Sequence, residues 1–228
     1  MPITTCVFDA YGTLFDVAAA AREAAREPAF AAIADTWPQL AEHWRLKQLQ
    51  YSWLRAVTGA HDDFWQVTQE GLDWSLEKMG VADDPALRER LLALYWELQA
   101  FAEVPAMLRA LKDGGLNTAI LSNGSPAMLD GAVQSAGISD LLDVSLSVES
   151  VGVFKPHVSV YDLVGAHYSC AKDEVLFVSS NGWDAAAATG YGFTTAWVNR
   201  GGDPVDRLPW KPAHQLRDLS GIPALAGL

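Results

Sequence analysis

The sequence predicts an α/β protein in which a Rossmann-like open parallel sheet is flanked by helices and carries an inserted helical-bundle cap domain. Three observations predict this fold. Short apolar runs rich in β-branched residues alternate with helical stretches, most of these runs end at polar residues, and roughly 100 residues of helical character separate the first run from the second. With 228 residues, half of them apolar, the chain can bury a sizeable core.

The expected strands are short and apolar. The first, "ITTCVFDA", stops at Asp9, as a buried parallel strand does at the functional edge of a sheet. Four similar runs follow at residues 117–123, 143–148, 174–180 and 194–199. Between them, "VPAMLRALKDGG" ends on a glycine pair, and "SPAMLDGAVQSAG" opens with Ser125 as N-cap and Pro126 at the first helical position. This alternation predicts helices on both faces of the sheet.

The gap between the first two strands is too long for one crossover helix. Its sequence is helical, so we expect a cap domain at residues 17–100 that hangs over the strand ends, and an α/β core domain made of residues 1–16 and 101–228. Within "PQLAEHWRLKQLQYSWLRAV", apolar side chains three or four residues apart predict a stripe that faces the core of the cap itself: Leu46, Leu49, Trp53 and Val57.

Charge and cysteine content limit the function and the compartment. The net charge of −12 argues against nucleic-acid and acidic-membrane partners, although a local Arg or Lys can still bind a small anion. Cys6 and Cys170 are far apart and form no CxxC pattern, which is typical of reduced thiols in a cytoplasmic protein. The sequence has neither a signal-like N-terminus nor a run of the ~18 apolar residues that a membrane span needs.

Polar side chains follow four of the predicted elements, at the edge where ligands bind in such sheets. They are Asp9 after the first strand, Ser122 and Asn123 after the second, Lys155 after the third, and Ser179, Asn181 and Asp184 after the fourth. Each of them alone is an ordinary cap or turn residue. Together, in this order on one sheet, they predict an active site.

Four segments, "FDAYGTLFD", "LSNGSP", "VFKPHVSVY" and "FVSSNGWD", resemble the four signature blocks of the haloacid dehalogenase superfamily. In the expected cap, "HWRLKQLQYSWLR" is similar to the same region of the L-2-haloacid dehalogenases within that superfamily. The resemblance runs from about residue 3 to about residue 200. It implies a hydrolase that acts on a small anionic 2-haloacid and forms a homodimer.

Position 11 separates this branch from the phosphatases of the superfamily, which carry a second Asp there and hold Mg²⁺. Here the residue is Tyr11, and the fourth block offers Asp184 as its single acid, so a cation with near-octahedral demands has too few carboxylates. Tyr11 instead supplies an apolar wall for a carbon–halogen bond that reacts away from water. The five histidines show no metal-ligand spacing, and no GxGxxG or Walker pattern implies a nucleotide cofactor.

The resemblance implies a two-step mechanism on an L-2-haloalkanoate. Asp9 attacks Cα in line with the carbon–halogen bond, halide leaves and an ester remains, and water then releases a D-2-hydroxy acid of inverted configuration. Lys155 is expected to lie against Asp9 and Asp184 and to keep both carboxylates ionised. Asp184, oriented by Ser179 and Asn181, would activate the water.

The same resemblance assigns three further polar residues. Ser122 and nearby backbone N–H groups would hold the substrate carboxylate. Thr13 would orient Asp9, and Tyr161 would hydrogen-bond within the cluster.

Arg45 of the cap would face down into the site with Asn123, where the departing halide needs a cation; a surface arginine on an amphipathic helix is the alternative. The expected apolar wall of the substrate pocket comprises Tyr11, Leu49, Phe64 and Trp183. For the leucine and the phenylalanine, plain core packing remains open. Leu46 and Gly182 depart from the residues expected at those positions, which leaves the shape of the pocket open.

Two alternative functions stay open at this point. A hydrolase with the same machinery could open another activated C–X bond, such as that of a small cyclic amino acid, and halide release from 2-chloropropionate separates the two. A non-catalytic member, kept as a binding or assembly protein, would have no need of Asp9, Lys155 and Asp184 together.

Overall fold

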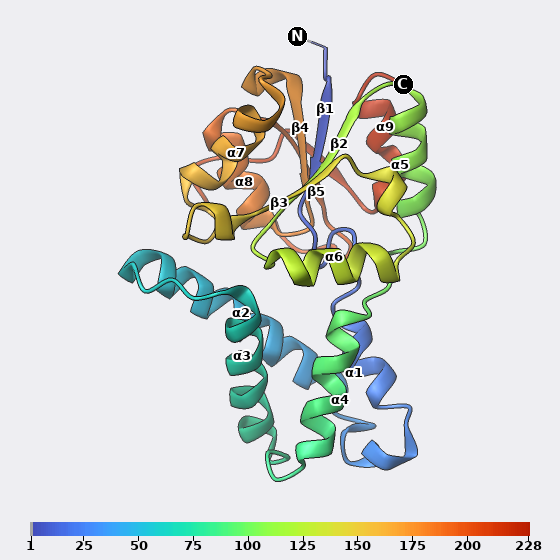
Figure 1. Ribbon diagram of the computed structural model, residues 1–228, viewed down its shortest axis with the longest axis vertical. Helices are drawn as coiled ribbons and strands as arrows, with labels where there is room; N and C mark the ends of the chain where they lie inside the picture. Colours follow the sequence, from blue (N-terminus) through green and yellow to red (C-terminus); the bar gives the residue numbers. More distant parts are fainter. Residues whose placement is uncertain (1) are drawn as a thin grey trace.

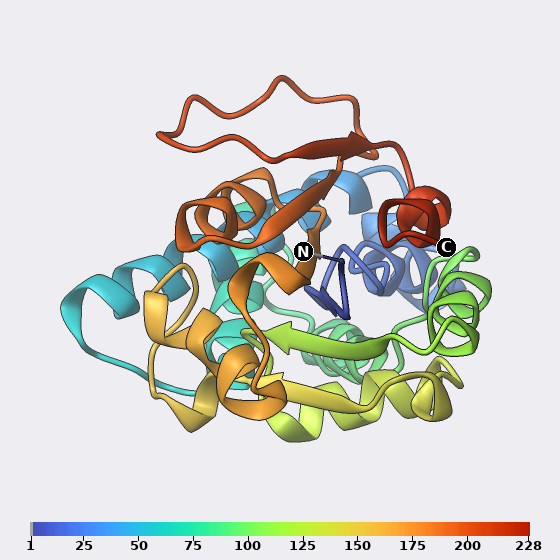
Figure 2. The ribbon, with the colours of Figure 1, turned by 90° about the horizontal axis from the view of Figure 1, so that it is seen from above.

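One parallel sheet organises the chain in the computed structural model, which describes residues 2–228. Its six strands lie in the order β3-β2-β1-β4-β5-β6, and all neighbouring strands are parallel (Figures 1 and 2). The strands are β1 (Thr5–Phe8), β2 (Asn117–Ser122), β3 (Val144–Ser147), β4 (Val175–Ser179), β5 (Thr194–Val198) and β6 (His214–Leu216). The predicted open parallel sheet is therefore confirmed.

The central strand β1 lies between β2 and β4 and is fully buried. Phe8 pairs in register with Ile120 on one side and with Val178 on the other. The strand order reverses at β1 and β4, because β2 and β3 follow in one direction and β5 and β6 in the other. Ligands bind in open sheets outside the carboxyl ends of the strands at such a reversal. Asp9 follows β1 at this point.

Helices cover both faces of the sheet. α7 and α8 lie on one side of it and α5 and α9 on the other, while α6 packs against the edge strand β3 (Figure 1). Their bounds are α5 (Val104–Asp113), α6 (Pro126–Ser135), α7 (Val158–Tyr168), α8 (Gly182–Tyr191) and α9 (Ile222–Leu225), with the short 3₁₀ helices η2 (Ser139–Leu141), η3 (Val148–Ser150), η4 (Lys172–Glu174) and η5 (Leu219–Gly221) in the connections. Ser125 stands at the N-cap of α6 and Pro126 at its first position, as predicted, although the serine side chain makes no capping hydrogen bond.

The helices between residues 17 and 100 gather beyond the carboxyl ends of the strands (Figure 1). They are α1 (Ala19–Ala24), η1 (Pro28–Ile33), α2 (Trp37–Thr58), α3 (Phe64–Met79) and α4 (Pro85–Trp96). Asp63 and Asp84 cap α3 and α4, since each side chain accepts a hydrogen bond from a backbone N–H three residues on. α2 and α3 end at Gly59 and Gly80, whose positive φ angles favour glycine.

α2 buries a different face from the one that the sequence predicts. Its buried residues are Leu40, Trp44, Gln48 and Ser52. The predicted core stripe is wrong, because two of its members, Leu46 and Val57, are exposed, Val57 by 86%.

Hydrogen bonds explain why the more polar face of α2 is buried. Trp44 Nε1 donates to the carbonyl oxygen of Thr68 at 2.8 Å. Gln48 Nε2 donates to Thr68 Oγ1 at 2.9 Å and to Tyr95 Oη at 3.0 Å. Buried polar groups that find partners in this way can stay inside. The apolar face of α2 is therefore turned partly toward the carboxyl ends of the strands and partly toward the outer surface.

The sequence does not predict β6. This strand has three residues, none of them buried, and it pairs with β5 at the edge of the sheet. A strand this short without an apolar run gives no periodic signal. The connection that precedes it, residues 199–213, stands out from the sheet (Figure 2). Within residues 2–228, no helix combines the length and the apolarity that crossing a membrane requires.

Candidate active site

The carboxylate of Asp9 is the centre of a hydrogen-bonded cluster at the end of β1. Its Oδ2 accepts from Asn181 Nδ2 at 2.9 Å and from Thr13 Oγ1 at 3.0 Å, while Ser179 Oγ lies at the longer distance of 3.5 Å. Its Oδ1 accepts from Lys155 Nζ at 3.2 Å. The contacts come from the end of β4, from the N-cap residue of α8 and from two loops, and together they fix the orientation of this carboxylate.

Lys155 joins Asp9 to a second carboxylate. Its Nζ donates to Asp184 Oδ2 at 2.8 Å, and Tyr161 Oη donates to Asp184 Oδ1 at 2.7 Å. All four side chains are buried, and Asp184 has no exposed surface at all. An ammonium between two carboxylates leaves this buried group with one net negative charge, which is far less costly than two uncompensated acids.

Burial and ion pairing shift the pKa values of Lys155 and Asp184 in opposite directions. Burial lowers the pKa of Lys155, but the attraction of Asp184 and Asp9 outweighs it, so the pKa of the ammonium lies above its ordinary value. Burial raises the pKa of Asp184, while Lys155 lowers it and the neighbouring Asp9 raises it again, and the result is a raised pKa. A carboxylate whose proton affinity is increased in this way is suited to accept a proton from water.

One predicted set of contacts needs correction. We expected Ser179 and Asn181 to orient Asp184, but both side chains lie within hydrogen-bonding reach of Asp9 Oδ2. The register of β4 against β1 explains the difference, because it aligns Ser179 beside Asp9. Asp184 lies in the first turn of α8, where Lys155 and Tyr161 are its hydrogen-bond partners.

Hydrogen bonds hold the loop after β1 against the end of β4. Thr13 Oγ1, which contacts Asp9, also accepts from the backbone N–H of Ser180 at 2.8 Å. Gly12 has a φ of +87°, which favours glycine, and an added Cβ there would also lie only 3.2 Å from Ser180 Oγ. Sequence reasoning missed Ser180, and its place beside Ser179 in "VSSN" was the available signal.

The loop after β2 presents Ser122 and Asn123 to the same centre. Asn123 Oδ1 accepts from the backbone N–H of Lys155 at 2.9 Å, which fixes the segment that carries the lysine. Ser122 Oγ accepts from the backbone N–H of Gly124 at 3.0 Å. The hydroxyl hydrogen of Ser122 therefore remains free to donate to a ligand.

Arg45 reaches from α2 into this site. Its Nη2 donates to the backbone carbonyl oxygen of Tyr11 at 3.0 Å and to Asn181 Oδ1 at 2.9 Å. The alternative of a surface arginine is therefore wrong. These contacts use one nitrogen of the guanidinium, so its other donors are available to an anion.

A small cavity of about 20 Å³, which suffices for about one water molecule, lies among these groups. It is lined by Asp9, Tyr11, Arg45, Leu49, Phe64, Ser122, Asn123, Lys155, Asn181 and Trp183. The structure thus brings the four residues of the predicted apolar wall to one cavity with the predicted polar residues. Thr13, Tyr161, Ser179 and Asp184 lie behind this lining, where they hold Asp9 or the Lys155 bridge.

Tightly packed rings back two parts of the wall. The ring of Tyr11 stacks on Tyr95 with centroids 5.6 Å apart and lies 5.9 Å from Phe64. Phe64 in turn packs edge-on against Phe154, at 6.1 Å. Burial, followed by the influence of Tyr95 and Asp9, raises the pKa of Tyr11 well above its ordinary value, so its phenol stays neutral. Sequence reasoning missed Tyr95 and Phe154, which support the wall from behind.

The two positions that depart from the resemblance lie outside the cavity lining. Leu46 is 55% exposed. At Gly182, an added Cβ would lie 2.6 Å from Asp206 Oδ2, and the carboxylate of an exposed side chain can move aside. Neither position therefore alters the cavity.

Among residues 2–228, no group of three or more His, Cys, Asp or Glu side chains is arranged to hold a metal ion. The two acids of the site are already bridged by the Lys155 ammonium. The arrangement supplies a carboxylate nucleophile, a second carboxylate that can act as a base, and a guanidinium for a leaving anion, in a site that admits little water.

The sequence matches the haloacid dehalogenase-like hydrolase family over residues 3–192. It is 41% identical over 224 residues to (S)-2-haloacid dehalogenase 1 of Pseudomonas sp. (strain CBS-3), covering 98% of this chain and 96% of that protein.

Solved structures agree with this match. A crystal structure of a dehalogenase has a TM-score of 0.93 and 36% identity, and covers 98% of this chain and 96% of that one. An L-2-haloacid dehalogenase from Xanthobacter autotrophicus, solved with chloropropionic acid covalently bound, has a TM-score of 0.86 and 35% identity, with 98% of each chain covered.

Proposed function

Because the chain belongs to the (S)-2-haloacid dehalogenases of the haloacid dehalogenase-like hydrolase family, we infer that it hydrolyses short-chain L-2-haloalkanoic acids to D-2-hydroxy acids and halide. One observation carries this inference beyond the family. Lys155 bridges Asp9 and Asp184 beside a cavity that Arg45 and four apolar side chains also line. Such a site combines a nucleophile, a base and an anion-binding group with little room for water.

Halide release from the two enantiomers of 2-chloropropionate tests this function. We expect chloride release from the L enantiomer and at least ~100-fold less from the D enantiomer, whose Cα does not present the carbon–chlorine bond in line with Asp9. Failure to release chloride from either enantiomer would contradict the assignment and favour a hydrolase for another C–X bond or a binding protein.

In the first step, Asp9 attacks Cα of the substrate. Its Oδ2 is engaged by Asn181 and Thr13, whereas Oδ1 has Lys155 as its hydrogen-bond donor within residues 2–228, so Oδ1 keeps a lone pair for the attack. A bond forms between this oxygen and Cα while the carbon–halogen bond breaks. Halide departs with the bonding electron pair toward the Arg45 guanidinium.

Substrate binding fixes the direction of this attack. The hydroxyl of Ser122 and backbone N–H groups beside it donate to the substrate carboxylate, and Asn123 holds the backbone at Lys155 in place. With the carboxylate held there and the halogen near Arg45, the alkyl group faces the apolar wall. This three-point arrangement is what selects one enantiomer.

In the second step, water hydrolyses the ester. Asp184 accepts a proton from the water, whose oxygen attacks Cγ of Asp9. The bond between Cγ and the ester oxygen then breaks, and that oxygen takes the second proton of the attacking water and leaves as the hydroxyl of the product. Asp9 is again a carboxylate, and the proton held by Asp184 is lost to solvent. Tyr161 and Lys155 orient Asp184 for this role, and Lys155 balances the charge while Asp9 is esterified.

Replacement of Arg45 by lysine should lower turnover at least ~10-fold, about 1.4 kcal/mol of barrier. The guanidinium can bind Asn181, the Tyr11 carbonyl and a halide together, which the point charge of lysine cannot reproduce. Initial rates of halide release measure the effect. The matched control is Arg55→Lys on the same helix, where the arginine pairs with Glu70 at 2.8 Å away from the cavity, and its rate should stay unchanged. Wild-type kinetics for Arg45→Lys would remove the residue from the mechanism.

Activity should be independent of added metal. Lys155 occupies the position between the two acids where a cation would otherwise be needed, so neither EDTA nor Mg²⁺ should change the rate by more than about twofold. The rate of halide release before and after chelation is the measurement. A tenfold loss that Mg²⁺ restores would contradict a metal-independent mechanism.

The proposal includes a division of the chain into two domains. Residues 17–100 form the cap domain, and residues 1–16 and 101–228 form the α/β core domain, so that the site lies between them. Support comes from Arg45 of α2, which donates to the Tyr11 carbonyl and to Asn181 across this boundary. The protein is cytoplasmic, where its two free cysteines, Cys6 and Cys170, stay reduced.

The protein also forms a homodimer. Leu46 and Leu54 of α2 are 55% and 54% exposed, and together they offer apolar surface that a second copy of the chain can cover. Light scattering should give twice the chain mass of 24.7 kDa. The mass of a single chain at micromolar concentration would contradict the dimer.

A further inference from the structure

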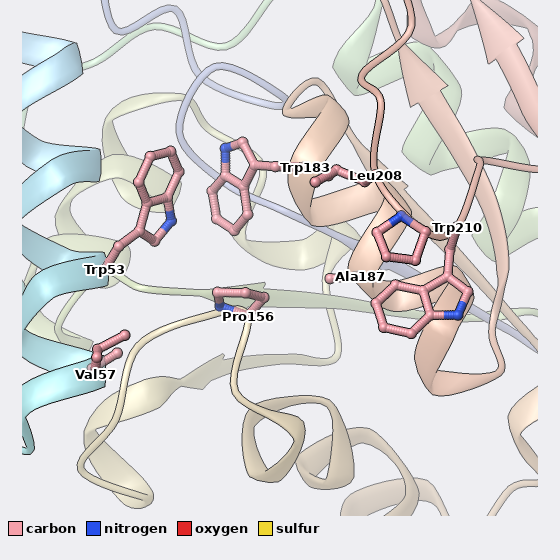
Figure 3. A pocket seen from close by; sticks show the side chains of 9 residues that line it. Trp53, Val57, Pro156, Trp183, Ala187, Leu208 and Trp210 are labelled. Carbon is pink, nitrogen blue, oxygen red and sulfur yellow. The ribbon is translucent and has the colours of Figure 1, made fainter.

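An apolar groove lies beside the active site, with a volume of about 440 Å³ (Figure 3). Its lining consists of Trp53, Ala56 and Val57 from α2, Pro156, Trp183 and Ala187 from the core side, and Leu208, Pro209 and Trp210 from the connection before β6. Every one of these side chains is apolar, and the volume is in the range of sites for small organic ligands. The mechanism above gives this groove no role.

Within residues 2–228, the groove and the catalytic cavity share one lining residue. Trp183 lines both of them. Its ring packs edge-on against Trp53, with centroids 5.3 Å apart, so a tryptophan of α2 supports it from the groove side (Figure 3). Trp183 Nε1 is buried without a hydrogen-bond partner among residues 2–228. Rotation of this indole therefore breaks no hydrogen bond.

Two other parts of the wall are backed by aromatic rings. Behind Tyr11 and Phe64 lie the rings of Tyr95 and Phe154. The catalytic cavity itself has room for about one water molecule. For an alkyl chain that outgrows the cavity, the nearest apolar volume on these observations is the groove on the other side of Trp183.

We propose that this groove is a second substrate subsite, which binds the alkyl tail of 2-haloalkanoic acids too long for the catalytic cavity, with Trp183 as the movable partition held by Trp53. The proposal rests on the dehalogenase function inferred above and adds the substrate class that the site accepts. Each methylene buried in the groove should favour the longer substrate by up to about fourfold in kcat/KM.

Two variants test the subsite without touching a reacting atom. Ala187→Phe fills the groove one turn of α8 beyond Trp183, and Trp53→Ala removes the support of the partition. The readout is the ratio of kcat/KM for L-2-bromohexanoate to that for L-2-bromopropionate, measured by bromide release. The ratio should fall at least ~10-fold in Ala187→Phe and rise at least ~3-fold in Trp53→Ala.

A matched tryptophan provides the control. Trp65 is also half-buried in the helical segment and packs on Trp96 at 4.8 Å, away from the groove. Trp65→Ala should leave the ratio unchanged. An unchanged ratio in both groove variants, or a wild type that acts on bromopropionate but not on bromohexanoate, would overturn the subsite.

Two further outcomes show whether the groove has another role or whether the dehalogenase function itself is absent. If Ala187→Phe loses both substrates alike and its mass by light scattering falls, the groove is an interface between copies of the chain and the subsite is refuted. If the wild type releases no bromide from L-2-bromopropionate, the dehalogenase function itself fails, and that result is distinct from a failure of the groove alone.

Discussion

An Asp9→Asn variant is expected to release halide at least ~10⁴-fold more slowly than the wild type, because the amide has no anionic oxygen to attack Cα. Asparagine has nearly the same shape and keeps one acceptor oxygen, which can serve either Thr13 and Asn181 or Lys155, so the packing around β1 should persist. The loss should appear in kcat, since Asp9 acts on Cα while Ser122 and Arg45 bind the substrate.

The matched control for this variant is another acid in the same loop. Asp16 accepts from the backbone N–H of Ala18 and pairs with Arg22 at 2.9 Å, outside the catalytic cavity. Asp16→Asn should keep kcat within about threefold of the wild type. If Asp9→Asn kept more than about 1% of wild-type kcat, Asp9 would not be the nucleophile.

Removal of the bridging ammonium should have the second largest effect. In Lys155→Met, kcat is expected to fall at least ~10³-fold, because two buried carboxylates lose their common cation and one takes up a proton. Lys155 lowers the pKa of Asp184, so its removal raises that pKa further, and the acidic limb of the kcat profile should move to higher pH. Residual activity should therefore rise toward alkaline pH.

The pH profile separates this electrostatic role from a purely structural one. Lys112 forms an exposed pair with Asp143 at 2.9 Å, and Lys112→Met serves as the control whose profile should match the wild type. Circular dichroism checks that Lys155→Met still folds. A folded Lys155→Met with an unshifted acidic limb would show that the ammonium does not control ionisation in the site.

Much of the sheet and of the site follows from local patterns in the sequence. Apolar runs that end at a polar residue mark strands whose ends meet at one edge, which is why Asp9, Ser122 and Ser179 converge. The resemblance to a known family adds Arg45, because no local signal distinguishes a buried arginine from a solvated one on an amphipathic helix.

Other features depend on tertiary contacts that no local pattern encodes. The buried face of α2 follows from hydrogen bonds to Thr68 and Tyr95, which lie 20 and 47 residues away from Gln48. The partners of Ser179 and Asn181 depend on the register between β4 and β1 rather than on their spacing from Asp184. The groove beside Trp183 needs four separate segments to meet, so the sequence gives no sign of it.

The origin of the product's oxygen shows whether the reaction passes through an ester of Asp9. If Asp9 attacks Cα, the new hydroxyl oxygen is a former carboxylate oxygen of Asp9, and solvent oxygen enters the enzyme first. In a single turnover with excess enzyme in H₂¹⁸O, we expect an unlabelled D-2-hydroxy acid and ¹⁸O in the peptide that contains Asp9. Labelled product with an unlabelled Asp9 peptide would contradict it and would make Asp9 a general base for direct attack by water.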